Sequence, residues 1–188
     1  RVLYRYSDLI LSTSERMNSE LINTFHIPPS MIRLLPNIVD ELRIRPGAGE
    51  VKRQPGEGVA FVAAGRLTKQ KGFDRLLFWF SRLGNTSAHL LILGDGSMKQ
   101  EMKILAQTLN IADRVTFSGF IDEPWPWFAG ADAFLLSSRW EGMPNVALEA
   151  LACGTPVITT PEAGGIAEVA KQTKSGTITI ASGEDEFI

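Results

Sequence analysis

The chain has 188 residues, 44% of them hydrophobic, with a formal net charge of −2 and a pI of about 5.8. A chain of this length can bury a full hydrophobic core and can hold one domain plus part of another. Its slightly acidic balance provides no general basic surface, which argues against nucleic acid or an anionic membrane surface as a partner. No apolar run approaches the ~20 residues of a membrane span, and no signal peptide pattern is present.

The cysteine content and the chain ends add two expectations. A single cysteine, Cys153, excludes an internal disulfide and suits a reducing compartment such as the cytoplasm. The first residue is Arg1 rather than Met, and residues 185–188 break off without an evident terminal helix. We therefore expect a fragment of a longer protein, truncated at its C-terminus.

Short apolar runs alternate with helical patterns along most of the chain, which is typical of βαβ units and a parallel sheet. The expected fold class is α/β, a Rossmann-like doubly wound parallel sheet with helices between the strands. Strands are predicted at 8–11, 32–35, 59–64, 90–93, 115–118, 133–136, 157–160 and 177–180.

The first predicted helix begins at a pattern that resembles a capping box, with Ser12 as the cap and Glu15 three residues later. Met17, Leu21 and Phe25 share one face of this helix, because residues three or four apart lie side by side. The pattern is a structural device first, and we assign it no chemistry.

Between residues 37 and 58 the alternation lapses, and residues 46–58 are rich in proline and glycine, the composition of a surface connection. We place a domain boundary here. Residues 1–38 would be the tail of an upstream domain, residues 39–58 an interdomain linker, and residues 59–188 most of a doubly wound α/β domain.

Three cations lie in the loop of residues 65–72, just before a predicted helix. Helix N-termini carry the positive end of the helix dipole, so Arg66, Lys69 and Lys71 are unfavourable there unless an anion joins them. A phosphate group would supply that anion, and ligands of open parallel sheets bind beyond the carboxyl ends of the strands, where this loop lies. The alternative is a set of solvated cations, with Asp74 offsetting the dipole.

Gly94 and Gly96 follow a predicted strand and invite a dinucleotide-binding interpretation, but Lys99 stands where the third glycine is expected. We interpret the two glycines as a tight turn with at most a wall contact to a ligand. This turn leads into a second capping-box pattern, at Ser97, which opens a helix ending near residue 109. An NAD-dependent dehydrogenase is disfavoured by Lys99.

Two aromatic segments have both a functional and a structural interpretation. Gly119, Phe120 and Ile121 follow a predicted strand and could present backbone groups to a planar base, or could be a glycine turn followed by core residues. Trp125 and Trp127 offer stacking surfaces, although aromatic residues on a short helix between strands usually serve packing.

Two features follow the strand at 157–160. Gly164 and Gly165 allow a close approach of the backbone to a ligand, although a plain turn explains them equally well. Glu168 falls in the first turn of the next helix, where compensation of the dipole is the default role.

His26 and His89 are far apart in the sequence and indicate neither a metal site nor a general base.

The helix predicted between Pro144 and Gly154 carries a carboxylate in an otherwise apolar sequence. Proline suits the first helical turn and glycine the position after the last. A helix that is apolar nearly all round is buried, and Asn145 and Glu149 form its polar stripe. An ionised carboxylate there needs partners, which a ligand with paired hydroxyls would supply. Glu141, eight positions before Glu149, either caps the helix or faces a ligand.

Several motifs occur in a fixed order, namely Gly65-Arg66…Lys71-Gly72, Glu141-x7-Glu149, Gly154-Thr155-Pro156-Val157 and Gly164-Gly165. Their combination resembles the C-terminal domain of retaining GT-B glycosyltransferases of family GT4, and the resemblance covers nearly the whole chain. Segments 7–15 and 35–40 look like the family's lead into its interdomain linker. One departure is Gly142-Met143-Pro144, where the family often has Gly-Phe-Gly, because proline removes an N–H donor.

The resemblance implies roles for these residues. Arg66 and Lys71 would bind the diphosphate of the donor and offset its growing charge, Glu149 would accept both ribose hydroxyls, and Glu141 would face the transferred sugar. The phosphates or the sugar would be contacted by the backbone of Met143, Pro144, Asn145 and Val146. The base would be framed by Gly119, Phe120 and Ile121. The cleft would be lined by Gly164 and Gly165.

The resemblance also implies an activity. The parent would be a cytoplasmic enzyme, or one at the inner face of the membrane, that transfers a sugar with retention from a UDP- or GDP-sugar to a glycan or lipid-linked glycan, as in cell-surface polysaccharide synthesis. No metal or further cofactor is expected. The acceptor site would lie in the N-terminal domain, so the isolated chain should bind nucleotide and transfer little sugar. The alternatives are a GT-B nucleotide-sugar epimerase and a non-catalytic nucleotide-sugar binding module.

Overall fold

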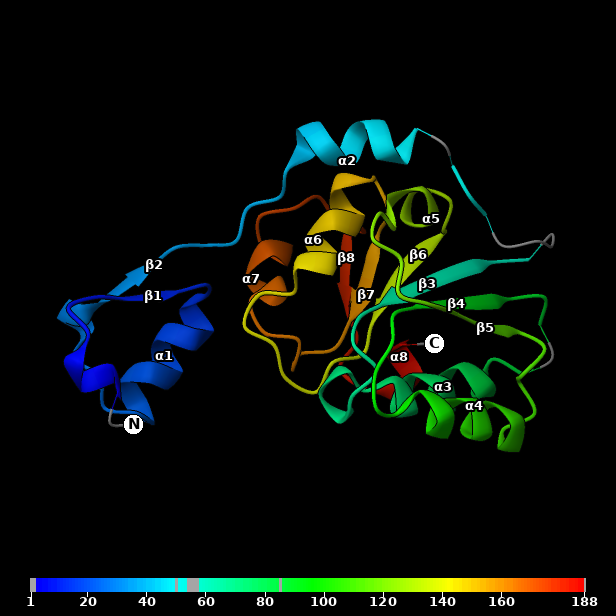
Figure 1. Ribbon diagram of the computed structural model, residues 1–188, viewed down its shortest axis with the longest axis horizontal. Coiled ribbons are helices and arrows are strands. Elements are labelled where there is room, and N and C mark those ends of the chain that lie inside the picture. The colour runs from blue at the N-terminus through cyan, green and yellow to red at the C-terminus, as the bar shows by residue number, and fades with distance from the viewer. Residues whose placement is uncertain (1–2, 50, 54–57, 85, 188) are drawn as a thin grey trace.

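A parallel sheet forms the centre of the protein, and the computed structural model describes it within residues 3–49, 51–53, 58–84 and 86–187 (Figure 1). In this part of the chain the sheet has six strands, in the order β5-β4-β3-β6-β7-β8, each parallel to its neighbours. They are β3 (Ala60–Ala64), β4 (His89–Leu93), β5 (Val115–Gly119), β6 (Ala133–Leu136), β7 (Val157–Thr159) and β8 (Ile178–Ile180). The order reverses between β3 and β6, which is the topological switch point of a doubly wound sheet. The predicted fold class is confirmed.

Helices cover both faces of this sheet. One layer contains α3 (Phe73–Arg82), α4 (Lys99–Thr108) and α8 (Glu184–Phe187). The other contains α2 (Glu41–Ala48), α5 (Trp125–Ala129), α6 (Asn145–Ala152) and α7 (Ile166–Ala170). A short 3-10 helix, η3 (Lys69–Lys71), directly precedes α3.

Strand β4 is buried on both faces, and its sequence reflects this. Leu90 and Ile92 belong to the core beneath α3 and α4, whereas Leu91 and Leu93 belong to the core on the opposite face. Because both faces are covered, a central parallel strand is a continuous apolar run rather than an alternating one.

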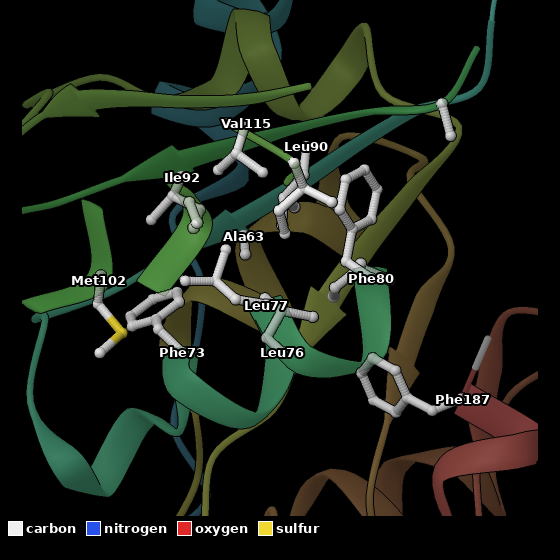
Figure 2. Packing of buried hydrophobic residues seen from close by; sticks show 14 of the residues in the cluster. Ala63, Phe73, Leu76, Leu77, Phe80, Leu90, Ile92, Met102, Val115 and Phe187 are labelled. Carbon is white, nitrogen blue, oxygen red and sulfur yellow. The ribbon is translucent and has the colours of Figure 1, made fainter. Parts of the chain in front are cut away.

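Helix α3 packs on the sheet through Phe73, Leu76, Leu77 and Phe80, which are at most 4% exposed. Their spacing of three and four residues places them on one face of the helix. Figure 2 shows these side chains directed toward the strands, with Leu90 close by. This packing fixes the start of α3, and so the end of the loop that precedes it.

The first part of the chain forms a separate small unit (Figure 1). Ile10, Leu21, Ile27 and Ile32 make its core, and Phe25 packs against them together with Met17, as the predicted shared face requires. The unit consists of η1 (Leu3–Tyr6), β1 (Ile10–Ser12), α1 (Glu15–Asn23), η2 (Pro29–Met31) and β2 (Ile32–Leu34), with β1 and β2 paired in parallel.

The two predicted capping boxes are wrong in their cap residues. Ser14, not Ser12, caps α1 by accepting the Met17 N–H at 3.1 Å, because β1 continues through Ser12. Helix α4 has no side-chain cap, and it begins two residues after Ser97. The turn before α4 is held by backbone contacts instead, as Met98 N–H donates to Leu67 O at 3.0 Å.

The predicted linker of residues 39–58 is not a plain surface connection, since it contains α2. Ile44 of α2 is 2% exposed and packs in the core with residues of α5 and α6. Pro46 and Gly47 are unfavourable in helices, which is why the composition of this segment predicted a loop. Residues 50 and 54–57 of the predicted linker lie outside the described residues.

Candidate functional site

A cavity of about 620 Å³ lies at the switch point of the sheet. Its walls come from the ends of β3, β4 and β5 with their loops and from the start of α6, so it occupies the carboxyl edge where ligands of such sheets bind. The lining residues are Ala64, Gly65, Arg66, Thr68, Gln70, Lys71, Leu93, Gly94, Asp95, Phe120, Ile121, Pro124 and Val146.

Lys71 and Glu141 form an ion pair beside this cavity, with Lys71 Nζ 2.6 Å from Glu141 Oε1. Ser138 Oγ donates to the same oxygen at 2.8 Å. The side chains of Lys71 and Glu141 are only 19% and 9% exposed. Two donors therefore share Oε1, and Glu141 is held by this pairing rather than by capping α6, which starts at Asn145 with no side-chain cap.

Arg66 differs from Lys71 in its environment. Its side chain is exposed at the cavity and forms no ion pair with the described residues. Lys69 is also exposed, but it does not line the cavity. Toward the cavity, this loop thus presents the Arg66 guanidinium, which is unpaired among the described residues, and the Lys71 ammonium, whose charge Glu141 balances.

The loop of residues 137–144, which carries Glu141, is fastened to α3 by two arginines. Arg139 donates to both oxygens of Asp74 at 2.7 Å, a bidentate pair. The hydrogen bond from Arg139 lowers the pKa of Asp74. Arg75 donates to Ser137 O at 2.8 Å and to Ser138 O at 2.6 Å, and burial lowers its pKa.

Sequence reasoning missed Arg75, Ser138 and Arg139. The polar run directly after the predicted strand 133–136 was a usable signal for Ser138 and Arg139, because side chains that follow parallel strands gather at one edge. Arg75 had no such signal, since an arginine on the polar face of an amphipathic helix is ordinary.

Two glycines of this region are required by close backbone contacts. Gly72 has a φ of +65°, and a Cβ on it would lie 2.1 Å from Ser137 O. Gly94 has a φ of +136°, and its Cβ would lie 2.0 Å from Gly65 O. The predicted wall contact is found for Gly94, which lines the cavity. The turn lies after Gly94, where Lys99 N–H donates to Gly96 O at 3.1 Å.

Glu149 lies outside the larger cavity and lines a smaller one of about 180 Å³ between α2, α5 and α6. Its Oε2 accepts a hydrogen bond from Trp125 Nε1 at 3.2 Å. The other lining residues are Ile38, Val39, Asp40, Arg43, Ile44, Trp125 and Asn145.

The prediction that α6 is buried nearly all round is wrong. Only Ala147 and Ala150 of the helix are fully buried, and Glu149 is half-buried. The reason is that α6 has one face on the sheet and another turned toward α2 across the smaller cavity. Pro144 occupies the N-cap position, whereas Gly154, with a φ of +85°, follows the last turn as predicted.

The segment of residues 143–146 contributes to both cavities and contacts Asn37. Val146 lines the larger cavity and Asn145 the smaller one. Met143 O accepts from Asn37 Nδ2 at 3.3 Å, and the same nitrogen donates to Asn145 Oδ1. Asn37, just before the predicted linker, is thereby tied to the start of α6, where Pro144 is buried.

The remaining predicted site residues lie as follows. Phe120 and Ile121 line the cavity, with Phe120 77% exposed, and Gly119 precedes them at a φ of +79°. Gly164 and Gly165 do not line it. A Cβ on Gly164 would lie 2.1 Å from Glu141 O, and Gly165 N–H donates to Gly142 O at 2.8 Å. The backbone that these two glycines approach closely is therefore that of the 137–144 loop.

Glu168 has a different role from the predicted one. Its carboxylate accepts the backbone N–H groups of Glu15 at 3.0 Å and Arg16 at 2.9 Å, so it caps α1 rather than its own helix. Arg16 Nη1 also donates to Pro161 O at 2.6 Å. These contacts join the upstream unit to the sheet domain, and no sequence pattern predicts them because 153 residues separate the partners.

Two structural features are absent from the described residues. No group of three or more His, Cys, Asp and Glu side chains within them is arranged to hold a metal ion. None of the helices in the same part of the chain is long and apolar enough to cross a membrane.

Comparison with known proteins links this geometry to a family. The sequence profile described as glycosyl transferases group 1 matches residues 50–188. N-acetylgalactosamine-N,N'-diacetylbacillosaminyl-diphospho-undecaprenol 4-alpha-N-acetylgalactosaminyltransferase of Campylobacter jejuni is 32% identical over 168 residues, 89% of this chain and 45% of that protein. Mannosylfructose-phosphate synthase of Agrobacterium fabrum is 33% identical over 180 residues, 87% of this chain and 40% of that protein.

A solved structure shows the same fold. HepE of Anabaena in complex with UDP-glucose matches with a TM-score of 0.79 over 98% of this chain and 53% of that one, at 20% identity. The chain therefore spans about half the length of these proteins or less.

Proposed function

Because the chain belongs to the glycosyl transferases group 1 family, we propose that it is the donor-binding part of a retaining glycosyltransferase. The parent would transfer a sugar from a nucleotide sugar to a glycan or lipid-linked glycan, as in cell-surface polysaccharide synthesis. The observation that carries this proposal is the cavity at the switch point, where Arg66 has no ion-pair partner among the described residues and the Lys71–Glu141 pair lies alongside.

The charges of the cavity suit a diphosphate. Arg66 is free to form charge-assisted hydrogen bonds with phosphate oxygens. Lys71 has three donors, so it can keep Glu141 and still reach a phosphate. When the bond between sugar and diphosphate breaks, negative charge grows on the leaving nucleotide, and both cations would stabilise it. Glu141, held on Oε1, would turn its other oxygen toward the sugar.

The nucleoside end of the donor would lie toward α5 and α6. Phe120 and Ile121 offer the base an apolar wall on the cavity. We assign Glu149 to the ribose hydroxyls, since a carboxylate matches two neighbouring hydroxyl donors. The positions support this assignment, because Pro124 and Val146 line the larger cavity while the adjacent Trp125 and Asn145 line the smaller one with Glu149.

We infer that the donor is a UDP- or GDP-sugar used without a metal ion. Support comes from HepE, whose solved structure holds UDP-glucose. The named relatives are a transferase and a synthase, which favours a transferase over an epimerase or a non-catalytic binding module.

The domain division is likewise a proposal. Residues 1–38 would be the tail of an N-terminal domain that carries the acceptor site, residues 39–58 with α2 the linker, and residues 59–188 the donor domain, truncated at its C-terminus. The parent would then work in the cytoplasm or at the inner face of a membrane, with any membrane contact made by the N-terminal domain. By itself this chain would bind nucleotide and transfer little or no sugar.

Calorimetric titration of the chain with UDP, GDP and ADP tests the donor site. We expect one of the three to bind, and Arg66→Ala to weaken binding by about tenfold, since one charge-assisted contact is lost. Lys69→Ala is the matched control, because Lys69 shares the loop but does not line the cavity. Failure of all three nucleotides to bind would refute the proposal, and equal losses in both variants would refute the role of Arg66.

A further inference from the structure

Trp125 and Glu149 are joined by a hydrogen bond between side chains that lie 24 residues apart in the sequence. The indole is 6% exposed, and its Nε1–H donates to Glu149 Oε2 at 3.2 Å. Within the described part of the chain, this is the only hydrogen bond recorded for either side chain. Oε1 of Glu149 is therefore left for another donor.

The indole of Trp125 is buried, with a guanidinium over its ring. Trp125 belongs to the core that also contains Ile44, Phe128 and Ala147, and the Arg43 guanidinium lies 5.3 Å from the centre of its ring. A ring packed in this way directs its N–H in one direction only. A buried indole N–H needs a hydrogen-bond acceptor, and here the acceptor is a carboxylate that lines a cavity.

The consequence for Glu149 is a defined orientation. The final torsion of a glutamate side chain is soft and adopts many angles. A donor on Oε2 restricts the carboxylate plane, so that Oε1 points away from the indole. Two adjacent ribose hydroxyls form good hydrogen bonds only with a carboxylate in a suitable plane, since such bonds weaken steeply with poor alignment.

We propose that Trp125 is a positioning residue that orients Glu149 for the ribose hydroxyls and so makes the site select ribonucleotides. This inference rests on the proposed function. Trp125 acts through Glu149 and needs no contact with the donor.

The test compares each ribonucleoside diphosphate with its 2′,3′-dideoxy counterpart, using UDP, GDP and ADP with the whole chain. The wild-type chain should bind one ribonucleotide more tightly than its dideoxy form. Trp125→Phe keeps an aromatic ring but removes the donor, and the preference for the ribonucleotide should fall about three- to tenfold, the usual effect of losing one hydrogen bond. Binding of the dideoxy form should be unchanged.

Trp127→Phe is the matched control, since Trp127 lies on the same helix and no hydrogen bond of its indole to a described residue is recorded. It should leave the preference intact. Combining Trp125→Phe with Glu149→Ala should lower the preference no further than Glu149→Ala alone, because the indole acts through the carboxylate.

A spectroscopic measurement covers the case in which Trp125→Phe does not fold. The four tryptophans give four indole N–H signals in a ¹⁵N-labelled sample. Glu149→Gln should shift one of them strongly, and the ribonucleotide that binds the wild-type chain should shift the same signal. If no indole signal responds to Glu149→Gln, the inference is wrong.

The outcomes separate the two proposals. No binding of any nucleotide overturns the donor site itself, and with it the role of Trp125. Equal binding of the ribo and dideoxy forms to the wild-type chain overturns the assignment of Glu149 to the ribose. A wild-type preference that survives in Trp125→Phe overturns only the positioning role.

Discussion

Replacing Lys71 by methionine keeps most of the volume of the side chain but leaves Glu141 without its cationic partner. Breaking a buried ion pair on one side typically costs about 3–5 kcal/mol. This pair is 19% and 9% exposed, and Ser138 still donates to Glu141. We therefore expect a smaller loss for Lys71→Met, about 2–3 kcal/mol, which is a fall in Tm of roughly 4–12 °C for a domain of this size.

Urea unfolding of the two single variants and the double variant measures this effect. Glu141→Gln should cost only about 1 kcal/mol, because the Lys71 ammonium can turn toward the cavity that it lines. The double variant should cost less than Lys71→Met alone, since the glutamine leaves no charge to desolvate. Lys69→Met is the control and should change stability by less than about 0.5 kcal/mol. If the double variant lost as much free energy of unfolding as the two single variants together, the pairing would be refuted.

Three further predictions concern charges and caps elsewhere in the structure. Arg139 lowers the pKa of Asp74. The pair therefore stabilises the fold above the unfolded-state pKa near ~3.9, and this stabilisation is lost as pH falls through the lower folded-state pKa. Asp74→Asn should lower the free energy of unfolding by about 1 kcal/mol at pH 7 in urea unfolding, with a deficit that shrinks from pH 5 downward. Burial first, and then the charge of Glu149, raises the pKa of Cys153 to about 11 from 9.0, so at pH 8 iodoacetamide should alkylate it roughly a hundredfold more slowly than in the urea-unfolded chain; equal rates would contradict its burial. Glu168→Ala removes the acceptor of the first two α1 amides, those of Glu15 and Arg16, but leaves the Ser14 cap. It should weaken the protection of these two amides by about 0.5–2 kcal/mol in hydrogen exchange, with α3 amides unaffected as an internal reference.

Local patterns in the sequence predicted the sheet and its strands well. The run from Leu90 to Leu93 is apolar at every position, a pattern typical of a short strand covered on both faces. The helical face of Phe73, Leu76, Leu77 and Phe80 was equally readable, because the core selects one stripe of the helix. Such features depend on neighbours within a turn or two, so no knowledge of the rest of the chain is needed.

The linker helix and the helix caps were not readable in the same way. Ile44 is buried because α5 and α6 happen to lie beneath α2, and this contact outweighs the poor helical propensity of Pro46 and Gly47. Ser12 matched a capping pattern, but its place at the end of β1 moved the cap to Ser14.

The candidate site, too, could be predicted from the sequence only in part. Its residues could be named from motifs, since Arg66, Lys71, Glu141 and Glu149 stand in an order that resembles a known family. The sequence could not show that Lys71 and Glu141 pair, because these side chains are 70 positions apart and come together through the pairing of β3 with β6. The pattern favoured packing for Trp125, because a hydrogen bond from a buried indole leaves no trace in the sequence.

By itself, then, the sequence determined the fold class, the edge of the sheet where ligands bind and the residue types gathered there, because period, burial and strand ends are local properties of the chain. Only the tertiary structure decided which charges meet. It paired Lys71 with Glu141, left Arg66 without an ion pair in the part of the chain that the structure describes, and gave Glu149 an indole partner. Those outcomes depend on distances across the packed sheet, and the free energy of a charge is set by its nearest neighbours in space.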